Sequence, residues 1–324
     1  MLSFNEYLNK VNETVANIQY PSKPSELYAP IAYTMGLGGK RIRPSLVLMS
    51  CDAFGGNFED AVLPAVGLEL YHNFTLLHDD VMDKADIRRG KPTVHIKWNE
   101  NAAILSGDAM LTMATQYIAK TPARVMAQVM DLFNKTAMEI YEGQQYDVDF
   151  EQRLDVKEEE YIHMIKLKTS VLLGCACKMG AIIGGADEKN ADAIYRFGEL
   201  IGLAFQLQDD LLDVYGDEKT FGKAIGGDIL NNKKTFMLIK ALELSVGDDN
   251  KELMSWINAE NPDKKAKIQA VTDIYTRTGV KEIAEKRISQ YKEEAVAILE
   301  NINLNVEAKQ VFLAFVDMLM NRKK

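Results

Sequence analysis

The chain has 324 residues, of which 47% are hydrophobic and 26% are charged, proportions that are ordinary for a soluble globular protein. Such a length allows one large domain or two smaller ones with a sizeable buried core, which excludes a disordered chain and a small disulfide scaffold. The formal net charge is −9, and an acidic chain is a poor candidate for nucleic-acid binding, which needs a basic surface. A phosphate ligand would therefore require basic residues gathered locally.

The N-terminal segment lacks the features of a targeting sequence. It has no basic stretch before an apolar run, so we expect no signal peptide. Because no run of about 18 uninterrupted apolar residues occurs, we also expect no membrane-spanning helix. Cys51, Cys175 and Cys177 lack the spacing of a zinc site, which predicts reduced core thiols in a cytoplasmic protein.

Helical periodicity dominates the rest of the chain. After a glycine-rich loop at 36–39, apolar residues recur every three or four positions over 62–77, and most other positions there are also apolar, as in a helix buried on most sides. Further helices are expected at 101–121, 123–147, 159–183, 191–215, 233–246 and 281–300. Alternating strand patterns and a linker between two halves are missing. We therefore predict a single all-α domain over residues 1–324, a bundle of roughly ten helices.

Two of these helices carry the same acidic pattern, Asp-Asp-x-x-Asp. It consists of Asp79, Asp80 and Asp83 in the first and of Asp209, Asp210 and Asp213 in the second. The first and last carboxylates of each motif share a helix face, and such close negative charges raise one another's pKa unless a cation lies between them. Oxygen ligands without His or Cys suit Mg²⁺, which often binds one or two carboxylates plus substrate phosphates. The ordinary alternative is an acidic helix end exposed to solvent. Two copies of the motif, each on an apolar helix where carboxylates would be poorly solvated, disfavour that alternative.

Basic residues accompany both acidic motifs. The segment GLGGKRIRP contains Lys40, Arg41 and Arg43 in a glycine loop that leads into a helix, where backbone N–H groups and the helix dipole favour an anion. Arg88 and Arg89 follow the first motif, Lys168 and Thr169 lie between the motifs, and Lys223, Lys233 and Lys234 follow the second. Any one of them alone would be read as a solvent-facing residue. Together they suit a ligand with two diphosphates, one held through Mg²⁺ and one held directly by Lys and Arg.

In six motifs, the chain resembles the trans-isoprenyl diphosphate synthases, or polyprenyl synthetases. The motifs follow in the family's order over residues 38–235 and read GGKRIRP, LLHDDVMDKADIRRGKPTVH, EGQQYD, KTS, FQLQDDLLDVYGD and GKAIGGDILNNKKT. The resemblance implies an isoprenoid synthase fold around a deep central cavity, a homodimer and three Mg²⁺ ions. It also implies head-to-tail condensation of an allylic diphosphate (dimethylallyl, geranyl or farnesyl) with isopentenyl diphosphate.

The resemblance further implies a role for each matching residue. Asp79, Asp83 and Asp209 would bind metal, with Asp80, Asp210 and Asp213 in support. Arg88, Lys168, Lys223 and Lys233 would hold the allylic diphosphate, and Lys40, Arg43, His72 and Arg89 would hold isopentenyl diphosphate. Thr169 and Gln206 would face the developing carbocation, and Gln144 and Asp147 match an inner polar pair. The basic C-terminal residues Arg322, Lys323 and Lys324 would lie near isopentenyl diphosphate.

His72 stands seven residues before Asp79, two helical turns away and therefore on the same face. A lone His on an apolar helix is usually a core group with satisfied hydrogen bonds, but the family pattern favours a ligand. His78 and His95 are expected to be structural.

Product length is expected to depend on the helix that bears Asp79. Phe74 lies five residues earlier, about 7–8 Å along the helix axis, and small Thr75 follows it. One aromatic side chain at this place would stop growth of the product tail, although ordinary core packing is the alternative. The first motif also lacks the two-residue insertion that many bacterial farnesyl synthases carry. An aromatic residue at this place without the insertion resembles geranylgeranyl synthases of the archaeal type. We predict a short-chain C15–C20 product.

Two other functions are open at this point. A class I terpene cyclase uses the same metal ligands but usually lacks GGKRIRP and the RRG stretch, and both are present here. A non-catalytic subunit that modifies the chain length of a synthase partner typically loses aspartates from one motif, and all six are intact. Both observations favour a catalytic synthase.

Overall fold

The computed structural model describes residues 1–216 and 225–320, so the expected ligands Lys223, Arg322, Lys323 and Lys324 lie outside the described residues. The first half contains α1 (Phe4–Ala16), α2 (Ser25–Gly36), α3 (Ile42–Ala53), α4 (Glu59–Met82), β1 (Ile87–Arg88), β2 (Lys91–Pro92), α5 (Val94–Lys97), α6 (Glu100–Ile118) and α7 (Met126–Glu151). The second half contains α8 (Glu158–Ile165), the π-helix η1 (Lys166–Ser170), α9 (Val171–Gly184), α10 (Glu188–Tyr215), α12 (Gly227–Leu230), α13 (Phe236–Leu244), α14 (Gly247–Ile257), α15 (Lys264–Arg277), α16 (Val280–Asn301) and α17 (Val306–Met320).

The all-α prediction is confirmed, and short elements add to the roughly ten helices expected. Helices such as α5 and α12 have four residues each, too few for a periodic pattern to appear. The stretch expected as one helix over 159–183 contains the π-helix η1 in its middle. Within residues 1–216 and 225–320, the β structure consists of β1 and β2, a two-residue antiparallel ladder.

The chain folds into two compact units. The N-terminal unit comprises residues 1–135, 175–195 and 302–311, and the C-terminal unit comprises residues 136–174, 196–301 and 312–324. Helices α7, α9, α10 and α17 begin in one unit and end in the other. That the two units form a single domain stays a prediction.

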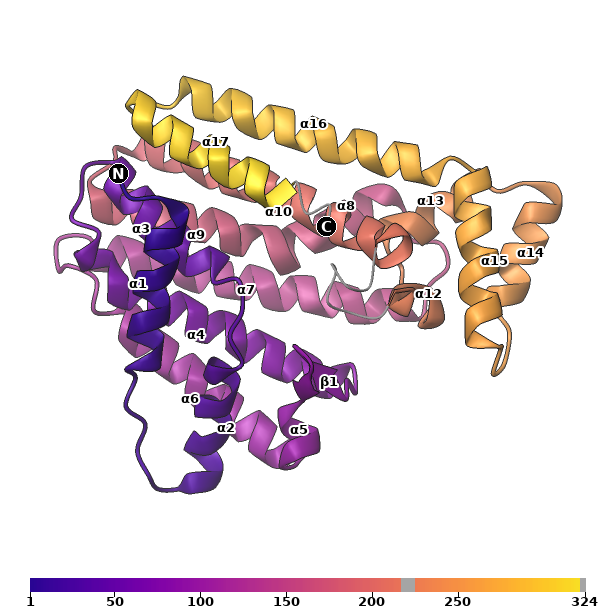
Figure 1. Ribbon diagram of the computed structural model, residues 1–324, viewed down its shortest axis with the longest axis horizontal. Helices are drawn as coiled ribbons and strands as arrows, with labels where there is room; N and C mark the ends of the chain where they lie inside the picture. The colour runs from indigo at the N-terminus through magenta and orange to yellow at the C-terminus, as the bar shows by residue number, and fades with distance from the viewer. Residues whose placement is uncertain (217–224, 321–324) are drawn as a thin grey trace. The chain divides into compact units, whose positions relative to one another are not determined.

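In the N-terminal unit, α4 is the central helix. It packs against α6 and α3 (Figure 1), and Leu68, Leu70 and Tyr71 on it are fully buried. Gly67 permits the close approach of α6, since a Cβ atom there would lie 2.8 Å from the carbonyl oxygen of Ala114. Burial on several sides explains why the sequence of α4 is apolar at nearly every position.

In the C-terminal unit, η1 is held closely by its neighbours. A Cβ atom on Gly202 of α10 would lie 2.6 Å from the Cα atom of Ser170, so only glycine fits at this crossing. Phe197 of α10 and Phe312 of α17 pack edge to face with ring centroids 5.4 Å apart. Helix α15 packs against α12, α14 and α16 (Figure 1).

One helical stretch in the described residues is long and apolar enough to cross a membrane, the segment Glu158–Gly184. Its most apolar window is 78% buried inside the protein, as in the core helix of a globular fold. The stretch therefore gives no support for a membrane span.

Candidate functional site

The first acidic motif forms the last turn of α4. Asp83 caps the helix, and its backbone N–H donates to the carbonyl oxygen of Asp79 at 2.8 Å, so these two residues stand one turn apart. Asp79 is half-buried and Asp83 is exposed, whereas Asp80 is only 5% exposed. The C-terminal end of a helix carries negative partial charge. Three acids at this end cost stability by themselves, which points to a role in binding a cation.

A short hairpin presents two arginines next to the first motif. Arg89 and Gly90 connect β1 to β2 with φ angles of 52° and 71°, the positive values of a type I′ turn. The Nε atom of Arg88 donates to both carboxylate oxygens of Asp80 at 2.8 Å. Burial raises the pKa of Asp80, and Arg88 opposes that rise. Arg88 and Asp80 thus neutralise each other, and their roles toward diphosphate and metal stay predictions.

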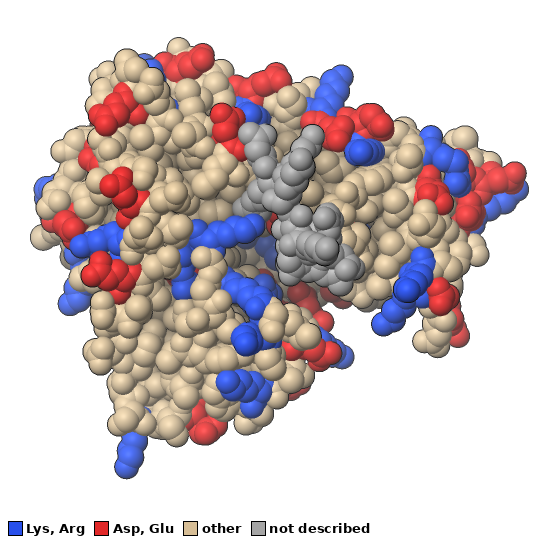
Figure 2. Space-filling view, viewed as in Figure 1, with Lys and Arg blue, Asp and Glu red and all other residues tan. Residues whose placement is uncertain are grey.

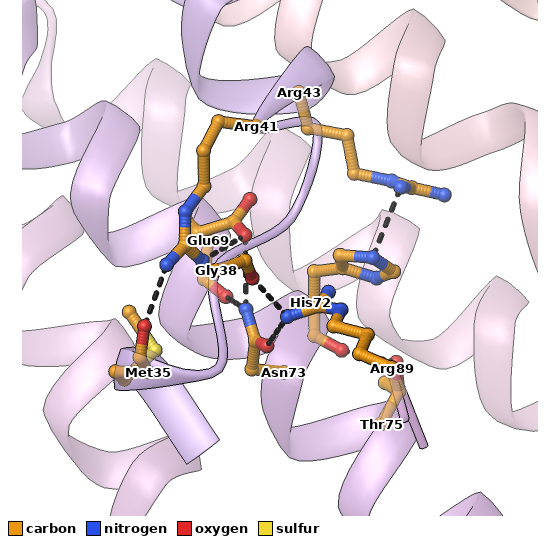
Figure 3. Close-up of polar contacts among 9 residues, drawn as sticks. All are labelled: Met35, Gly38, Arg41, Arg43, Glu69, His72, Asn73, Thr75 and Arg89. Carbon is orange, nitrogen blue, oxygen red and sulfur yellow. Dashed lines mark hydrogen bonds and ion pairs between the residues drawn. The ribbon is translucent and has the colours of Figure 1, made fainter. Parts of the chain in front are cut away.

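Arg43 and His72 form a second pair in the N-terminal unit. The Nη1 atom of Arg43 lies 3.1 Å from Nε2 of His72 (Figure 3). Burial lowers the pKa of His72 well below its ordinary value, and the positive charges of Arg43 and Arg89 lower it further. The imidazole is therefore neutral and accepts a hydrogen bond from Arg43, which orients the guanidinium. Lys40 and Arg89 are exposed in the same region.

Basic side chains also gather on the surface. Figure 2 shows a group of Lys and Arg side chains on the visible face, over the part where Figure 1 draws the N-terminal helices. The acidic chain thus has a local concentration of positive charge, which a phosphate ligand requires.

In the C-terminal unit, a π-helix carries Lys168 and Thr169. Such short π-helices occur frequently at functional sites. A Cβ atom on Gly143 of α7 would lie 2.4 Å from the backbone nitrogen of Lys168, so α7 lies directly against η1. This close approach lets Lys168 Nζ form an ion pair with Asp147, one member of the expected inner polar pair. Their side chains are 21% and 18% exposed. The Lys168 ammonium is thereby held in one place yet stays accessible.

A chain of hydrogen bonds links η1 to the second acidic motif. Thr169 Oγ1 donates to Gln206 Oε1, and Gln206 Nε2 donates to Asp210 Oδ1, both at 3.2 Å. The buried Tyr161 hydroxyl donates to the other oxygen of Asp210. Burial and the nearby charge of Asp228 raise the pKa of Asp210 to about 7, against the effect of these hydrogen bonds. The two residues expected at the carbocation, Thr169 and Gln206, thus lie together.

The third aspartate of the second motif binds the backbone at the start of α12. The carbonyl oxygen of Asp213 accepts from Gly226 N–H at 2.7 Å, and its Oδ2 atom accepts from Asp228 N–H at 3.0 Å. Asp209 is half-buried one turn earlier, and Lys233 is exposed in the segment between α12 and α13. Asp213 therefore has a structural task beside its predicted role in metal binding.

The expected chain-length residue lies in an aromatic cluster. Phe74 is 5% exposed, and its ring centroid lies 5.6 Å from that of Tyr71 and 4.8 Å from that of His78. Thr75 is half-buried, and its hydroxyl donates to the carbonyl oxygen of His72 at 2.9 Å. Phe74 is thus fixed by neighbours on its own helix, and its effect on product length stays a prediction.

Several residues of this region were not predicted from the sequence. They are Glu69 and Asn73, which bond to each other and to basic residues, and Tyr161 and Asp228, which contact the second motif. Arg41, named from the sequence as part of an anion-binding loop, is instead buried and paired with Glu69. Glu69 did carry a signal, because an acid inside an apolar helix needs a buried partner. Sequence spacing does not reveal that partner, since Arg41 is 28 residues away.

Comparison with known proteins decides the family. A family profile described as polyprenyl synthetase matches residues 24–275, which is more than half of the chain. The chain belongs to the polyprenyl synthetase family. A geranylgeranyl diphosphate synthase of Methanosarcina mazei is 38% identical over 305 residues, which cover 93% of this chain and 91% of the relative. A geranylfarnesyl diphosphate synthase of Natronomonas pharaonis is 34% identical and covers 96% and 94%.

Solved structures agree with membership of the polyprenyl synthetases. A crystal structure of a geranylgeranyl pyrophosphate synthase superposes with a TM-score of 0.94 at 43% identity and covers all of both chains. The structure of a polyprenyl synthase from Caulobacter crescentus, complexed with calcium and isoprenyl diphosphate, has a TM-score of 0.89 at 25% identity and covers 99% and 96%. These similarities confirm the expected isoprenoid synthase fold.

Proposed function

We propose that this chain condenses an allylic diphosphate head to tail with isopentenyl diphosphate and releases an all-trans C20 prenyl diphosphate. The observation that carries the proposal is the family match over residues 24–275, which spans both acidic motifs with all six aspartates intact. The relatives named above are synthases of C20 and C25 products. The C20 product is therefore the one supported both by the relatives and by the range predicted from sequence.

The donor set of the acidic motifs fits Mg²⁺. Among residues 1–216 and 225–320, no group of three or more His, Cys, Asp or Glu side chains lies close enough to hold a metal by itself. Mg²⁺ is commonly bound by one or two carboxylates, with water and substrate phosphates as its other ligands. Asp79, Asp83 and Asp209 would each contribute to such sites, and three ions is the number the family resemblance implies. When bound, Mg²⁺ would neutralise the charge that develops on the leaving diphosphate.

The residues of the C-terminal unit support ionisation of the allylic substrate. Lys168, held by Asp147, would donate to the departing diphosphate, where charge develops in the transition state. The oxygens of Thr169 and Gln206 would face the positive charge on the allylic carbon. Apolar surroundings would exclude water, which would otherwise capture the cation. The isopentenyl double bond then attacks this carbon, and the released diphosphate takes the proton that is lost.

The N-terminal unit supports binding of isopentenyl diphosphate. Lys40, Arg43 and Arg89 supply three positive charges, and His72 orients Arg43 through the hydrogen bond described above. Arginine suits diphosphate oxygens because its planar donors bind two of them at once.

Phe74 provides a test of product length. We expect Phe74→Ala to yield products longer than those of the wild type, because removal of the ring opens space beside Tyr71 and His78. Chromatography of the dephosphorylated prenols measures this directly. Leu68→Ala, which removes a fully buried side chain from the same helix, serves as the packing control and should leave product length unchanged. Equal product profiles for wild type and Phe74→Ala would remove Phe74 from this role.

We also propose that the protein acts as a homodimer, as the family resemblance implies. Ile104 and Leu105 of α6 are 44% and 58% exposed, and a subunit interface over this part of α6 would cover both apolar side chains. Light scattering of the purified protein measures the assembly, and a monomer at micromolar concentration would contradict it. Cytoplasmic localisation stays a prediction.

The function is tested with labelled isopentenyl diphosphate and each allylic primer in turn, with Mg²⁺ present. We expect label in an all-trans C20 prenol. A cyclic hydrocarbon formed from the allylic substrate alone would indicate a terpene cyclase. No product without an added synthase partner would indicate a non-catalytic subunit.

A further inference from the structure

The N-terminal unit contains a buried ion pair that none of the roles above uses. Glu69 of α4 and Arg41 are each 2% exposed in their side chains, and Arg41 Nη1 lies 2.6 Å from Glu69 Oε1 (Figure 3). Burial of two charges costs desolvation free energy that their attraction often fails to offset, so such a pair is weak evidence for stability. Its contacts with neighbouring residues point to another purpose.

Arg41 fixes both ends of the glycine loop at 36–41. It precedes α3 with a left-handed φ of 46°, and its Nη2 atom donates to the carbonyl oxygen of Met35 at 2.6 Å. One guanidinium thus joins the end of α2 to α4 through Met35 and Glu69. Because Lys40 and Arg43 stand on either side of Arg41, this clamp also sets the backbone that carries both predicted diphosphate ligands.

Glu69 also determines the orientation of Asn73. The amide Nδ2 of Asn73 donates to the carbonyl oxygen of Glu69 at 2.8 Å and to Glu69 Oε1 at 3.0 Å. A flipped amide would place its oxygen against these two oxygens, which is repulsive. The carbonyl end of Asn73 is therefore turned toward Arg89, whose Nη1 atom lies 3.5 Å from Asn73 Oδ1.

Arg89 is held on two further sides. Its Nη1 atom also donates to the carbonyl oxygen of Gly38. A Cβ atom on Gly39 would lie 2.9 Å from the guanidinium carbon, and the φ of Gly39 is 135°, so the guanidinium rests on bare backbone. Figure 3 shows Arg89 pointing toward Asn73 and Gly38. Arg89 nevertheless stays exposed and is available to an anion.

We propose that Glu69 and Asn73 are positioning residues that orient Arg89 and the loop at 36–41 toward the diphosphate of isopentenyl diphosphate. The inference rests on the proposed function and deepens it. In this proposal neither residue contacts the substrate directly. Each acts through hydrogen bonds to a basic residue or to the loop.

Asn73→Leu tests the proposal, because leucine has a similar volume and neither polar atom. We expect KM for isopentenyl diphosphate to rise about tenfold, with kcat and KM for the allylic substrate within twofold of wild type. Asn73→Ser is the milder variant, since its hydroxyl still bonds the carbonyl of Glu69 but is too short to reach Arg89. Glu69→Gln, which removes the charge that pairs with Arg41, should also raise KM for isopentenyl diphosphate.

Leu68→Ala is the control for packing, as it removes a fully buried side chain from α4 about 140° around the helix from Asn73. It should lower the melting temperature and leave both KM values unchanged. If Asn73 had a merely structural role, Asn73→Ser would likewise lower the melting temperature and leave both KM values unchanged. That result would overturn the proposal. So would equal rises in the two KM values.

A second readout does not depend on enzymatic activity. Trypsin cleaves the bond between Arg89 and Gly90 only when the Arg89 side chain leaves its contacts, whereas the exposed Lys84, which is followed by Ala85, provides an internal reference. We expect Asn73→Ser to increase cleavage after Arg89 relative to Lys84 at least threefold, as measured by mass spectrometry. An unchanged ratio would overturn the positioning role. If the wild type makes no prenyl product while the ratio rises, the proposed function fails and the restraint of Arg89 stands.

Discussion

Asp79→Asn is expected to lower kcat by on the order of 10²–10³-fold, the usual cost of removing one charge-stabilising group from a reacting centre. Asparagine keeps the shape of the side chain and one oxygen but loses the negative charge that would bind Mg²⁺. Because Asp79 is half-buried on the last turn of α4, water does not fully replace the lost ligand. Steady-state rates at saturating concentrations of both substrates and a range of Mg²⁺ concentrations measure the effect.

Asp86→Asn provides the control for charge. Asp86 is an exposed acid three residues after Asp83 and outside the Asp-Asp-x-x-Asp pattern, so its loss changes the net charge by the same amount. We expect wild-type rates for it. Equal rates for Asp79→Asn and wild type would show that Asp79 does not bind a catalytic metal.

Lys168→Met is expected to reduce kcat by a similar factor of about 10²–10³, because it removes the cation that would stabilise the leaving diphosphate. Lys166→Met is the matched control. Lys166 lies on the same π-helix and forms an ion pair with Glu199 at 2.8 Å, so its loss breaks a comparable contact without touching the predicted site. A rate for Lys168→Met equal to that of Lys166→Met would contradict the role of Lys168.

The stability of Lys168→Met separates catalysis from folding. Burial raises the pKa of Asp147, but Lys168 and Lys233 lower it by more, and the net pKa lies below the ordinary value. A lowered folded-state pKa stabilises the protein above the ordinary pKa of an aspartate, and that contribution is lost as the pH falls through the folded value. Removing Lys168 should therefore destabilise the fold at neutral pH by about 1–3 kcal/mol, since Asp147 loses its partner.

The double variant Lys168→Met with Asp147→Asn completes this test. Asparagine carries no charge, so we expect thermal unfolding at neutral pH to recover toward wild type while kcat stays low. Recovery of both stability and rate would show that Lys168 serves the fold alone.

The sequence predicts α4 and both acidic motifs well because their signals are local. Apolar residues at helical spacing predicted 62–77, and the helix spans Glu59–Met82. Asp79 and Asp83 stand one turn apart because they are four residues apart on that helix. The proximity of Thr169 to Gln206 followed only from the family resemblance, since 37 residues separate them.

The features that were missed depend on contacts between distant segments or on short elements. The hairpin at Ile87–Pro92 has two-residue strands, which cannot show an alternating pattern. The π-helix at Lys166–Ser170 lies where Gly143 and Gly202 allow neighbouring helices to approach closely. A glycine in the sequence does not by itself predict that two helices cross there. The pairing of Glu69 with Arg41 needed the fold, although a buried acid in α4 signalled that some partner must exist.

The central claim is that the acidic motifs and the basic residues together bring about metal-dependent condensation of two diphosphate substrates. Its most direct test is the release of inorganic diphosphate, measured with the allylic substrate alone, with both substrates, and with both plus EDTA. We predict one diphosphate released per isopentenyl unit incorporated, little release from the allylic substrate alone, and none in EDTA. An undiminished rate in EDTA, or equal release without isopentenyl diphosphate, would contradict it.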